Sequence, residues 1–382
     1  MDPLAAARSI RPTLEAEAGP SEAARTLTPT AVDALWESGL MTYLNPREAG
    51  GDEPQLAAMI DTWIELASAD GAAGWIGIAN LPTAMAAALY LPDQGFDEVF
   101  GSGDRVTSAG QLFPNGMGTV VDGGFEVTGT WNFGSGVGHS PVICAGFMQV
   151  VDGEPLIDLD QFLVAVIDAA DVELTDGWHV QGLRGTGSYD YKVDAVFVPE
   201  HRTYKLFTRT PQRESAPLHR LGILPVVAAG HGSWALGVAK SMLDDVATLA
   251  KEKVRMSDME TLALRQTFQR NLSHHTGMWR AARAGLIEAF TTVEAAAAAG
   301  NDLTPAMRAD LRIAATYATE ASREITQWAH LAAGTSAIRD GSRLERAFRD
   351  MYTGSQHAFI SEKTYIDAAQ IHLGLVEDLP GV

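Results

Sequence analysis

Three short segments of the 382-residue chain combine residue types that hold flat ligands or move protons. The first spans residues 129–139, where a strand-like run ends in Trp131 and passes into a Gly/Ser turn with Ser135 and His139. Glycines let a backbone approach a ligand closely, a Trp can wall a flat site, and a serine hydroxyl can bond to the ligand's edge. An ordinary hairpin with a buried Trp has the same spacing, so this segment alone does not establish a site.

The second segment, residues 182–190, is a glycine-rich loop that carries Arg184, Thr186 and Ser188 just before a strand-like run. Such a loop can present hydroxyls and amides to a polar or anionic ring edge. A solvated connection between strands has the same composition, so this motif is also weak when it is taken alone.

The third segment lies near the C-terminus, where Arg346, Arg349 and Asp350 are followed by His357. Arg346 and Asp350 are four residues apart and can pair along a helix, and His357 would lie on roughly the same face two turns later. The Arg-Asp pair could equally orient a helix end across a subunit contact. A lone helical histidine is more often a core or surface residue than a catalyst, so the segment depends on its context.

Composition and missing motifs narrow the chemistry. The net charge of −20 repels phosphate backbones, so nucleic acid is not an expected partner. One cysteine, Cys144, excludes an internal disulfide and fits a reducing cytoplasm; we expect neither a signal peptide nor an apolar run of the ~18–20 residues that span a bilayer. The sequence has no GxGxxG, phosphate loop, HExxH, CxxC or GxSxG, which disfavours an NAD fold, a metal site, a kinase and a serine esterase.

The elements that must position these segments fall into three zones, which predict an α+β fold. Residues 1–103 show helical apolar spacing, residues 104–212 contain short strand-like runs separated by Asp-Gly turns, and residues 213–382 are helical again. In the last zone Thr304 predicts a helix start and Gly334 its end. Long helices with apolar stripes favour an antiparallel bundle.

Taken in order, these segments resemble the acyl-CoA dehydrogenase superfamily over nearly the whole chain. The matching stretches are residues 39–51 with a Gly-Leu…Pro…Gly-Gly pattern, 107–118, 131–135, 182–199, Arg265 with Phe268, and 346–350. The resemblance implies an N-terminal α-helical domain (1–103), a central β-barrel domain (104–212) and a C-terminal four-helix bundle (213–382), assembled as a homotetramer.

Within that superfamily the chain is more similar to two-component flavin-dependent monooxygenases, such as the oxygenase components of 4-hydroxyphenylacetate and steroid-phenol hydroxylases. Many dehydrogenases carry a catalytic Glu shortly after the Arg-Asp, and that position is Ala358 here. The monooxygenase resemblance rests on Gly74-Trp75, on residues 131–139, on residues 185–188 and on His357. Some of these hydroxylases also have a histidine near residues 80–82, which this chain lacks.

The resemblance implies an enzyme that takes reduced flavin, FMNH2 or FADH2, from a separate NAD(P)H-flavin reductase. Addition of O2 would give a C4a-hydroperoxyflavin that hydroxylates a small aromatic, phenolic, polyketide-like or amine substrate. The residues carried over are His357 and Ser135 for catalysis; Trp131, Phe133, Ser135, Arg184, Thr186, Ser188, Arg265, Phe268 and Arg349 for flavin; and Trp75, Phe113 and Met117 for substrate, with no metal.

Two other functions stay open. An FAD-dependent acyl-CoA or acyl-carrier dehydrogenase would need a base elsewhere, for example Asp340 or Glu345. A non-catalytic relative that has lost flavin is the third interpretation, and the intact loops around Trp131, Ser135 and Thr186 argue against it.

Overall fold

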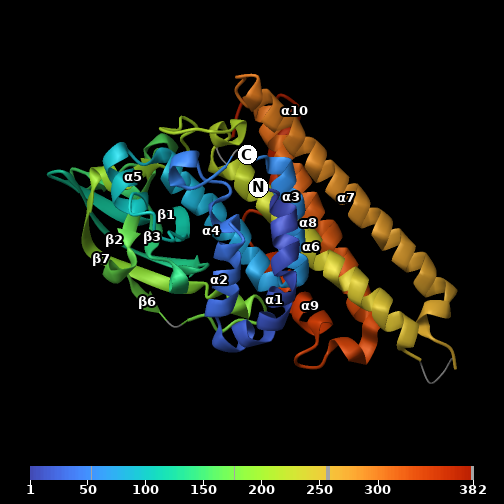
Figure 1. Ribbon diagram of the computed structural model, residues 1–382. Coiled ribbons are helices and arrows are strands. Elements are labelled where there is room, and N and C mark those ends of the chain that lie inside the picture. Colours follow the sequence, from blue (N-terminus) through green and yellow to red (C-terminus); the bar gives the residue numbers. More distant parts are fainter. Residues whose placement is uncertain (53, 176, 255–258, 380–382) are drawn as a thin grey trace.

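The computed structural model describes residues 1–52, 54–175, 177–254 and 259–379 (Figure 1). The first helices are α1 (Pro3–Ala24), α2 (Pro29–Glu37), α3 (Leu56–Ala69), α4 (Gly71–Tyr90) and α5 (Asp93–Phe100). The strands are β1 (Ser108–Val121), β2 (Gly124–Gly134), β3 (Val142–Val151), β4 (Glu154–Pro155), β5 (Leu163–Asp168), β6 (Glu173–Thr175), β7 (Tyr189–Pro199) and β8 (Thr203–Lys205). The later helices are α6 (Ile223–Glu252), α7 (Gln266–Ala298), α8 (Pro305–Ala333), α9 (Arg343–Gly354) and α10 (Glu362–His372). The predicted α+β order of helices, strands and helices is confirmed.

The strands form one eight-stranded sheet with the order β6-β7-β2-β1-β3-β5-β8, and β4 pairs with β3. Residues from β1, β2, β3, β5 and β7 share a core that includes Trp131, Phe147 and Tyr191. Cys144 and Val164, on the same strands, belong instead to the large core that the helices build. The sheet therefore covers its own small core with one face and packs against the helices with the other (Figure 1).

Strand β7 alternates between buried and exposed side chains until a bulge interrupts it. Tyr191 and Val193 are buried, whereas Lys192 and Asp194 are exposed. Ala195, which would continue the buried face, is exposed and has φ +51°, where the pairing of β2 with β7 shifts register. An extra residue in one strand turns the following side chains over, so the alternation could not be extended past this point.

Helix α8 begins and ends where the sequence predicts. The Thr304 hydroxyl accepts a hydrogen bond from the Met307 N–H (3.2 Å), Pro305 is the first helical residue, and Gly334 follows the last one with φ +56°. Helix α9 starts after Ser342.

The predicted relation between α9 and the residues around it needs two corrections. Because α9 stops at Gly354, His357 lies beyond the helix and does not continue its face. Arg346 and Asp350 do not pair along α9 as predicted: Arg346 pairs with Glu22 (2.9 Å), and Asp350 accepts from the Leu183 N–H (2.6 Å).

Helix α4 lies between the sheet and the bundle and packs against α3, α6 and β1 (Figure 1). By length and composition it could cross a membrane, but 94% of its most apolar stretch is buried inside the protein. Asn80, Pro82 and Thr83 interrupt the apolar run of this helix. A helix that is apolar all round and covered by other elements is a core helix, and α4 carries Trp75 and Asn80 into the interior.

Candidate functional site

Four segments that are far apart in sequence bring polar and aromatic side chains together around Trp75. Trp75 comes from α4, Ser135 from the turn after β2, and His231 from α6, while His357 follows α9. The Trp75 indole N–H donates to Ser135 Oγ (3.0 Å), and its ring lies edge-on to the rings of His231 (5.2 Å) and His357 (6.0 Å). Trp75 therefore connects a set of hydroxyl groups with a pair of histidines.

Trp75, Ser135, Ser188, Thr186 and the Leu183 carbonyl form a continuous run of hydrogen bonds, called here the hydroxyl chain. Ser135 Oγ lies 2.8 Å from Ser188 Oγ, which lies 2.7 Å from Thr186 Oγ1, and Thr186 donates to the Leu183 carbonyl (2.8 Å). Because an indole only donates and a carbonyl only accepts, each hydroxyl must donate away from Trp75. The proton of Ser135 is thus committed to Ser188, and toward any further ligand Ser135 is an acceptor.

The backbone of Ser135 is held by Asn80, whose amide donates to the Ser135 carbonyl (2.8 Å). Gly136 makes this approach possible, since it has φ +82° and a Cβ there would lie 2.4 Å from Asn80 Oδ1. In the described part of the chain, Asn80 Oδ1 and His139 Nδ1 are buried without a hydrogen-bond partner. Burial lowers the pKa of His139 to about 4, so this imidazole is neutral at pH 7. The turn therefore carries polar atoms that a bound polar group would satisfy.

The histidine pair is neutral as well. The His231 and His357 rings lie 4.2 Å apart. Burial, with the positive charge of Arg312, lowers the pKa of His357 to about 4, and burial lowers that of His231 well below its ordinary range. The Phe359 N–H donates to His357 Nδ1 (3.2 Å), so the neutral ring carries its proton on Nε2. His357 is therefore placed to donate a hydrogen bond rather than to remove a proton.

Aromatic rings surround the histidines. Trp234 meets Trp75 edge-to-face at 4.9 Å, and Phe359 stacks on His231 at 5.9 Å. Gly354 makes the first contact possible, because a Cβ there would lie 2.2 Å from the Trp234 ring. The Arg312 guanidinium lies 3.6 Å above the Phe359 ring and donates to its carbonyl (2.9 Å).

The far end of the hydroxyl chain is tied to α9. Leu183, whose carbonyl ends the chain, donates its N–H to Asp350. Burial, together with the nearby Asp70 carboxylate, raises the pKa of Asp350 to about 7. Gly71 and Gly182 permit this packing, because a Cβ at either position would collide with Asp350 or the Arg349 backbone.

Trp131 was predicted to form a wall of the flavin site, but the structure places it elsewhere. Its ring is fully buried in the small core of the sheet, stacked on Tyr191 at 5.3 Å, and its N–H donates to the Gly146 carbonyl (2.9 Å). Gly116 and Gly129 leave the space that the indole fills. This arrangement corrects the prediction: Trp131 supports the strand that ends at Ser135, and Trp75 takes the place beside the hydroxyls.

Three other predicted residues lie on exposed surface. The side chains of Phe133 and Phe113 are 65% and 66% exposed, and that of Met117 is 40% exposed. Phe133 has φ +63° and donates its N–H to Asp190 (3.2 Å). Phe113 lies within the irregular stretch of β1 between Gln111 and Gly116, and Met117 follows it. Their predicted roles in binding flavin and substrate stay predictions.

Arg184 and Arg349 line a recess of about 760 Å³ between α1, α9 and the loop before β7. Arg184 donates to the Val180 carbonyl (2.8 Å), and Arg349 pairs with both Glu345 and Glu22. Glu345, considered as a dehydrogenase base, is therefore already held by an arginine.

Arg265 and Phe268 begin α7, at the end of the long helices that points away from the sheet (Figure 1). Phe268 is buried and packs on Trp328 at 5.7 Å. Within one chain these two residues are remote from Ser135.

Sequence reasoning missed His231, Trp234, Asn80 and Arg312 as members of the site. His231 and Trp234 lie among apolar residues in the sequence of α6, and both residue types also occur in ordinary cores. The available signal was a histidine one turn before a tryptophan on that helix.

Comparisons with known proteins agree with this geometry. The family model described as "Acyl-CoA dehydrogenase, C-terminal domain" matches residues 229–362. Indole-3-acetate monooxygenase of Pseudomonas putida is 28% identical over 96% of this chain and 92% of its own. The flavin-dependent monooxygenase oxygenase subunit HsaA of Mycobacterium tuberculosis is 29% identical over 97% of this chain and 95% of its own. The structure of XiaF from Streptomyces sp., in complex with FADH2 and glycerol, has a TM-score of 0.92 and 22% identity over 100% of this chain and 97% of its own.

These relatives support the predicted monooxygenase over the acyl-CoA dehydrogenase alternative. Over nearly its whole length the chain is similar to the oxygenase components of two-component flavin-dependent monooxygenases, and the comparisons identify it as a flavin-dependent oxidoreductase with the acyl-CoA dehydrogenase fold.

Proposed function

We propose that the protein is the oxygenase component that hydroxylates a small aromatic substrate with reduced flavin and O2, the flavin coming from a separate NAD(P)H-dependent reductase. The observation that carries this proposal is the hydroxyl chain ending at Trp75, with two neutral histidines on the other side of the indole. The residues fit a flavin ring, because buried polar atoms of Asn80 and His139 beside Ser135 lack partners among the described residues.

Ser135 would face the flavin as an acceptor. Since its proton is donated to Ser188, it can accept from an N–H at the ring edge but cannot donate to a bare ring nitrogen. Reduced flavin carries such an N–H at N5, whereas oxidised flavin does not. The polarity of the hydroxyl chain therefore favours the reduced cofactor, and Thr186 and Ser188 act by fixing that polarity.

The cofactor supplies the electrons for splitting O2, and the chain's own residues control water and protons. Trp75, Trp234 and Phe359 provide an apolar surrounding that excludes water. The Nε2–H of His357 would donate a hydrogen bond to the reacting oxygen atoms, and His231 would support that ring.

Arg184 and Arg349 would border the cofactor's phosphate from the recess that they line. Arg265 and Phe268 would serve a second copy of the chain, because they lie at the far end of the bundle. Such sharing fits a homotetramer, whose size light scattering would measure. The single cysteine, Cys144, is buried and unpaired with another cysteine, in keeping with a cytoplasmic protein.

An anaerobic titration with reduced FMN and reduced FAD tests the proposal. The protein should bind one reduced flavin more tightly than its oxidised form, and mixing with O2 should give a transient spectrum that differs from both. Tightly held oxidised FAD that acyl thioesters bleach would instead establish the dehydrogenase.

A further inference from the structure

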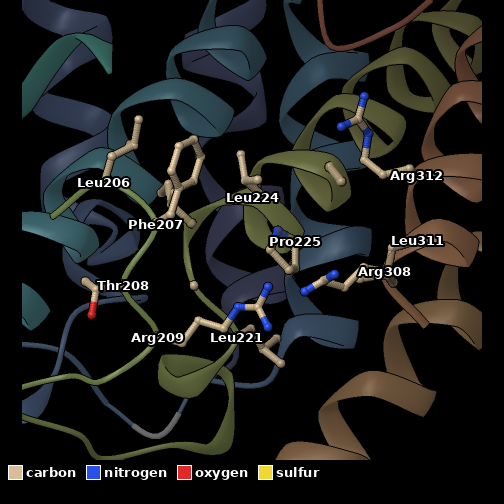
Figure 2. Close-up of a pocket in the computed structure, with 13 residues that line it drawn as sticks. Leu206, Phe207, Thr208, Arg209, Leu221, Leu224, Pro225, Arg308, Leu311 and Arg312 are labelled. Atoms are coloured by element: carbon tan, nitrogen blue, oxygen red, sulfur yellow. The ribbon is translucent and has the colours of Figure 1, made fainter. Parts of the chain in front are cut away.

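Three arginines line a small pocket between the segment after β8, the start of α6 and the first turns of α8 (Figure 2). They are Arg209, Arg308 and Arg312, and Figure 2 shows Arg209 and Arg308 pointing toward one another across the pocket. Its volume is about 40 Å³, enough for a carboxylate group or a few water molecules but not for a ring.

The positive charges of these arginines are energetically unfavourable in this buried arrangement. Arg308 and Arg312 are four residues apart on α8, a spacing at which like charges repel. The Arg308 side chain is only 9% exposed, and its Nε is buried without a partner among the described residues. Burial and the charge of Arg308 lower the pKa of Arg209, and burial lowers that of Arg312 to about 10. A bound anion would relieve both the repulsion and the burial.

Among the described residues, one carboxylate pairs directly with Arg308. Asp378, near the C-terminus, pairs with Arg308 and is itself 55% exposed. Asp302 and Asp367 act on Arg209 and Arg312 through space, and Asp367 is already paired with Lys363. Asp378 shows that a carboxylate can reach Arg308 with its charge in contact with solvent.

The pocket adjoins the histidine pair along two elements. Ala228 of α6 lines the pocket, and His231 follows one turn later. Arg312 lines the pocket and also lies over Phe359, whose N–H is bonded to His357. Gly222, with φ +79°, leaves room for the Arg209 side chain, whose Cγ would lie 3.2 Å from a Cβ there.

We propose that Arg209 and Arg308, with Arg312 behind them, form an anion site that holds the carboxylate of an aromatic substrate whose ring extends toward His231 and His357. This inference rests on the proposed function and names its substrate class: an aromatic ring that carries a short acidic side chain. Arg209 and Arg308 determine specificity, and Asp378 competes with the substrate for Arg308.

The test compares carboxylates with neutral isosteres. Calorimetry on the full chain, with and without reduced flavin under anaerobic conditions, would measure binding of indole-3-acetate against indole-3-acetamide and of 4-hydroxyphenylacetate against its amide. We expect at least one acid to bind more tightly than its amide. Arg308→Gln should weaken the acid roughly tenfold to a hundredfold, as expected for one charged hydrogen bond, and leave the amide unchanged.

Asp378→Asn should act in the opposite direction and strengthen acid binding severalfold, an outcome that damage to the fold cannot produce. Arg280→Gln, on the exposed side of α7, is the matched control and should change nothing. Equal affinity for acids and amides, no change in Arg308→Gln, or tighter binding of inorganic phosphate than of the acids would overturn the proposal. If the acid preference persists but no flavin turnover occurs, the anion site stands and the proposed function falls.

Discussion

The hydroxyl chain and the arginine pocket both adjoin the histidine pair and are built on contrasting principles. In the hydroxyl chain every hydroxyl proton has a partner within the protein, and no group is charged. In the arginine pocket Arg209 and Arg308 face each other, and among the described residues Asp378 is the carboxylate that pairs with Arg308. The first arrangement fixes an orientation before any ligand arrives, whereas the second would gain a further partner when an anion binds.

Of the substitutions that test this contrast, replacement of His357 should have the largest effect, because this residue adjoins both the hydroxyl chain and the arginine pocket. His357→Ala removes the Nε2–H donor, and we expect roughly a hundredfold less product for each flavin oxidised, with the lost oxygen appearing as hydrogen peroxide. Product and peroxide would be measured together, with exposed Gln356→Ala as the control. Full coupling in His357→Ala would remove this residue from the mechanism.

Breaking the hydroxyl chain at its centre should have the next largest effect. Ser135→Ala leaves the buried Trp75 N–H unpaired, which should cost about 1–3 kcal/mol of unfolding free energy and weaken reduced-flavin binding about tenfold. Ser140→Ala is the matched control, since this buried serine donates to the Gly136 carbonyl in the same turn. If both variants bind reduced flavin equally well, Ser135 is structural only.

Asp350, which binds the Leu183 end of the hydroxyl chain, should make the stability of the fold depend on pH. Asp350 has a pKa of about 7 in the fold, well above its ordinary value, so folding takes up a proton between about pH 4 and 7. The stability that the protonated group contributes is therefore present below about pH 4 and is lost progressively as the pH rises from there to about 7. Asp350→Asn keeps an acceptor for Leu183 but cannot ionise.

Thermal and denaturant unfolding across this range would check that expectation. Relative to the wild type, Asp350→Asn should gain up to about 1.4 kcal/mol per pH unit between pH 4 and 7 and nothing further above it. A difference that is constant with pH would mean that Asp350 is ionised throughout.

The smallest expected effect is the dependence of binding on salt concentration, which distinguishes the charged arginine pocket from the uncharged hydroxyl chain. Raising NaCl from 50 to 500 mM should weaken carboxylate binding by only a few fold, because Arg308 is buried and poorly screened. Binding of the neutral amides should not change. Equal salt dependence for acids and amides would contradict a charged subsite.

The sequence predicts the fold more completely than the site. Thr304, Pro305 and Gly334 mark helix α8 through local hydrogen bonds and backbone angles that short motifs carry by themselves. Ser135, Ser188, Thr186 and Trp75, which the family resemblance assigns to flavin and substrate, are joined by hydrogen bonds in the structure, and their roles stay predictions.

The missed features depend on tertiary packing. Trp131 and Trp75 cannot be told apart in the sequence by residue type. The pleat of β2 decides that the Trp131 side chain points into the core of the sheet. Arg209 and Arg308 are about a hundred residues apart, and no local pattern indicates that their guanidinium groups face each other. The bulge at Ala195 and the early end of α9 similarly follow from neighbours rather than from local preference.

The contact of Asp350 with Leu183, beside Gly71, has a consequence for how such chains can be recombined. A single point joins the N-terminal helices, the sheet and the bundle, and it tolerates no side chain at positions 71 and 182. A chimera that takes its C-terminal helices from a homologue inherits the residue at position 350 from one parent and the residues at positions 71 and 182 from the other. Crossovers anywhere between residues 183 and 349 will therefore yield folded hybrids only when both parents share this junction, and libraries of shuffled genes should be screened for it before any assay of substrate range.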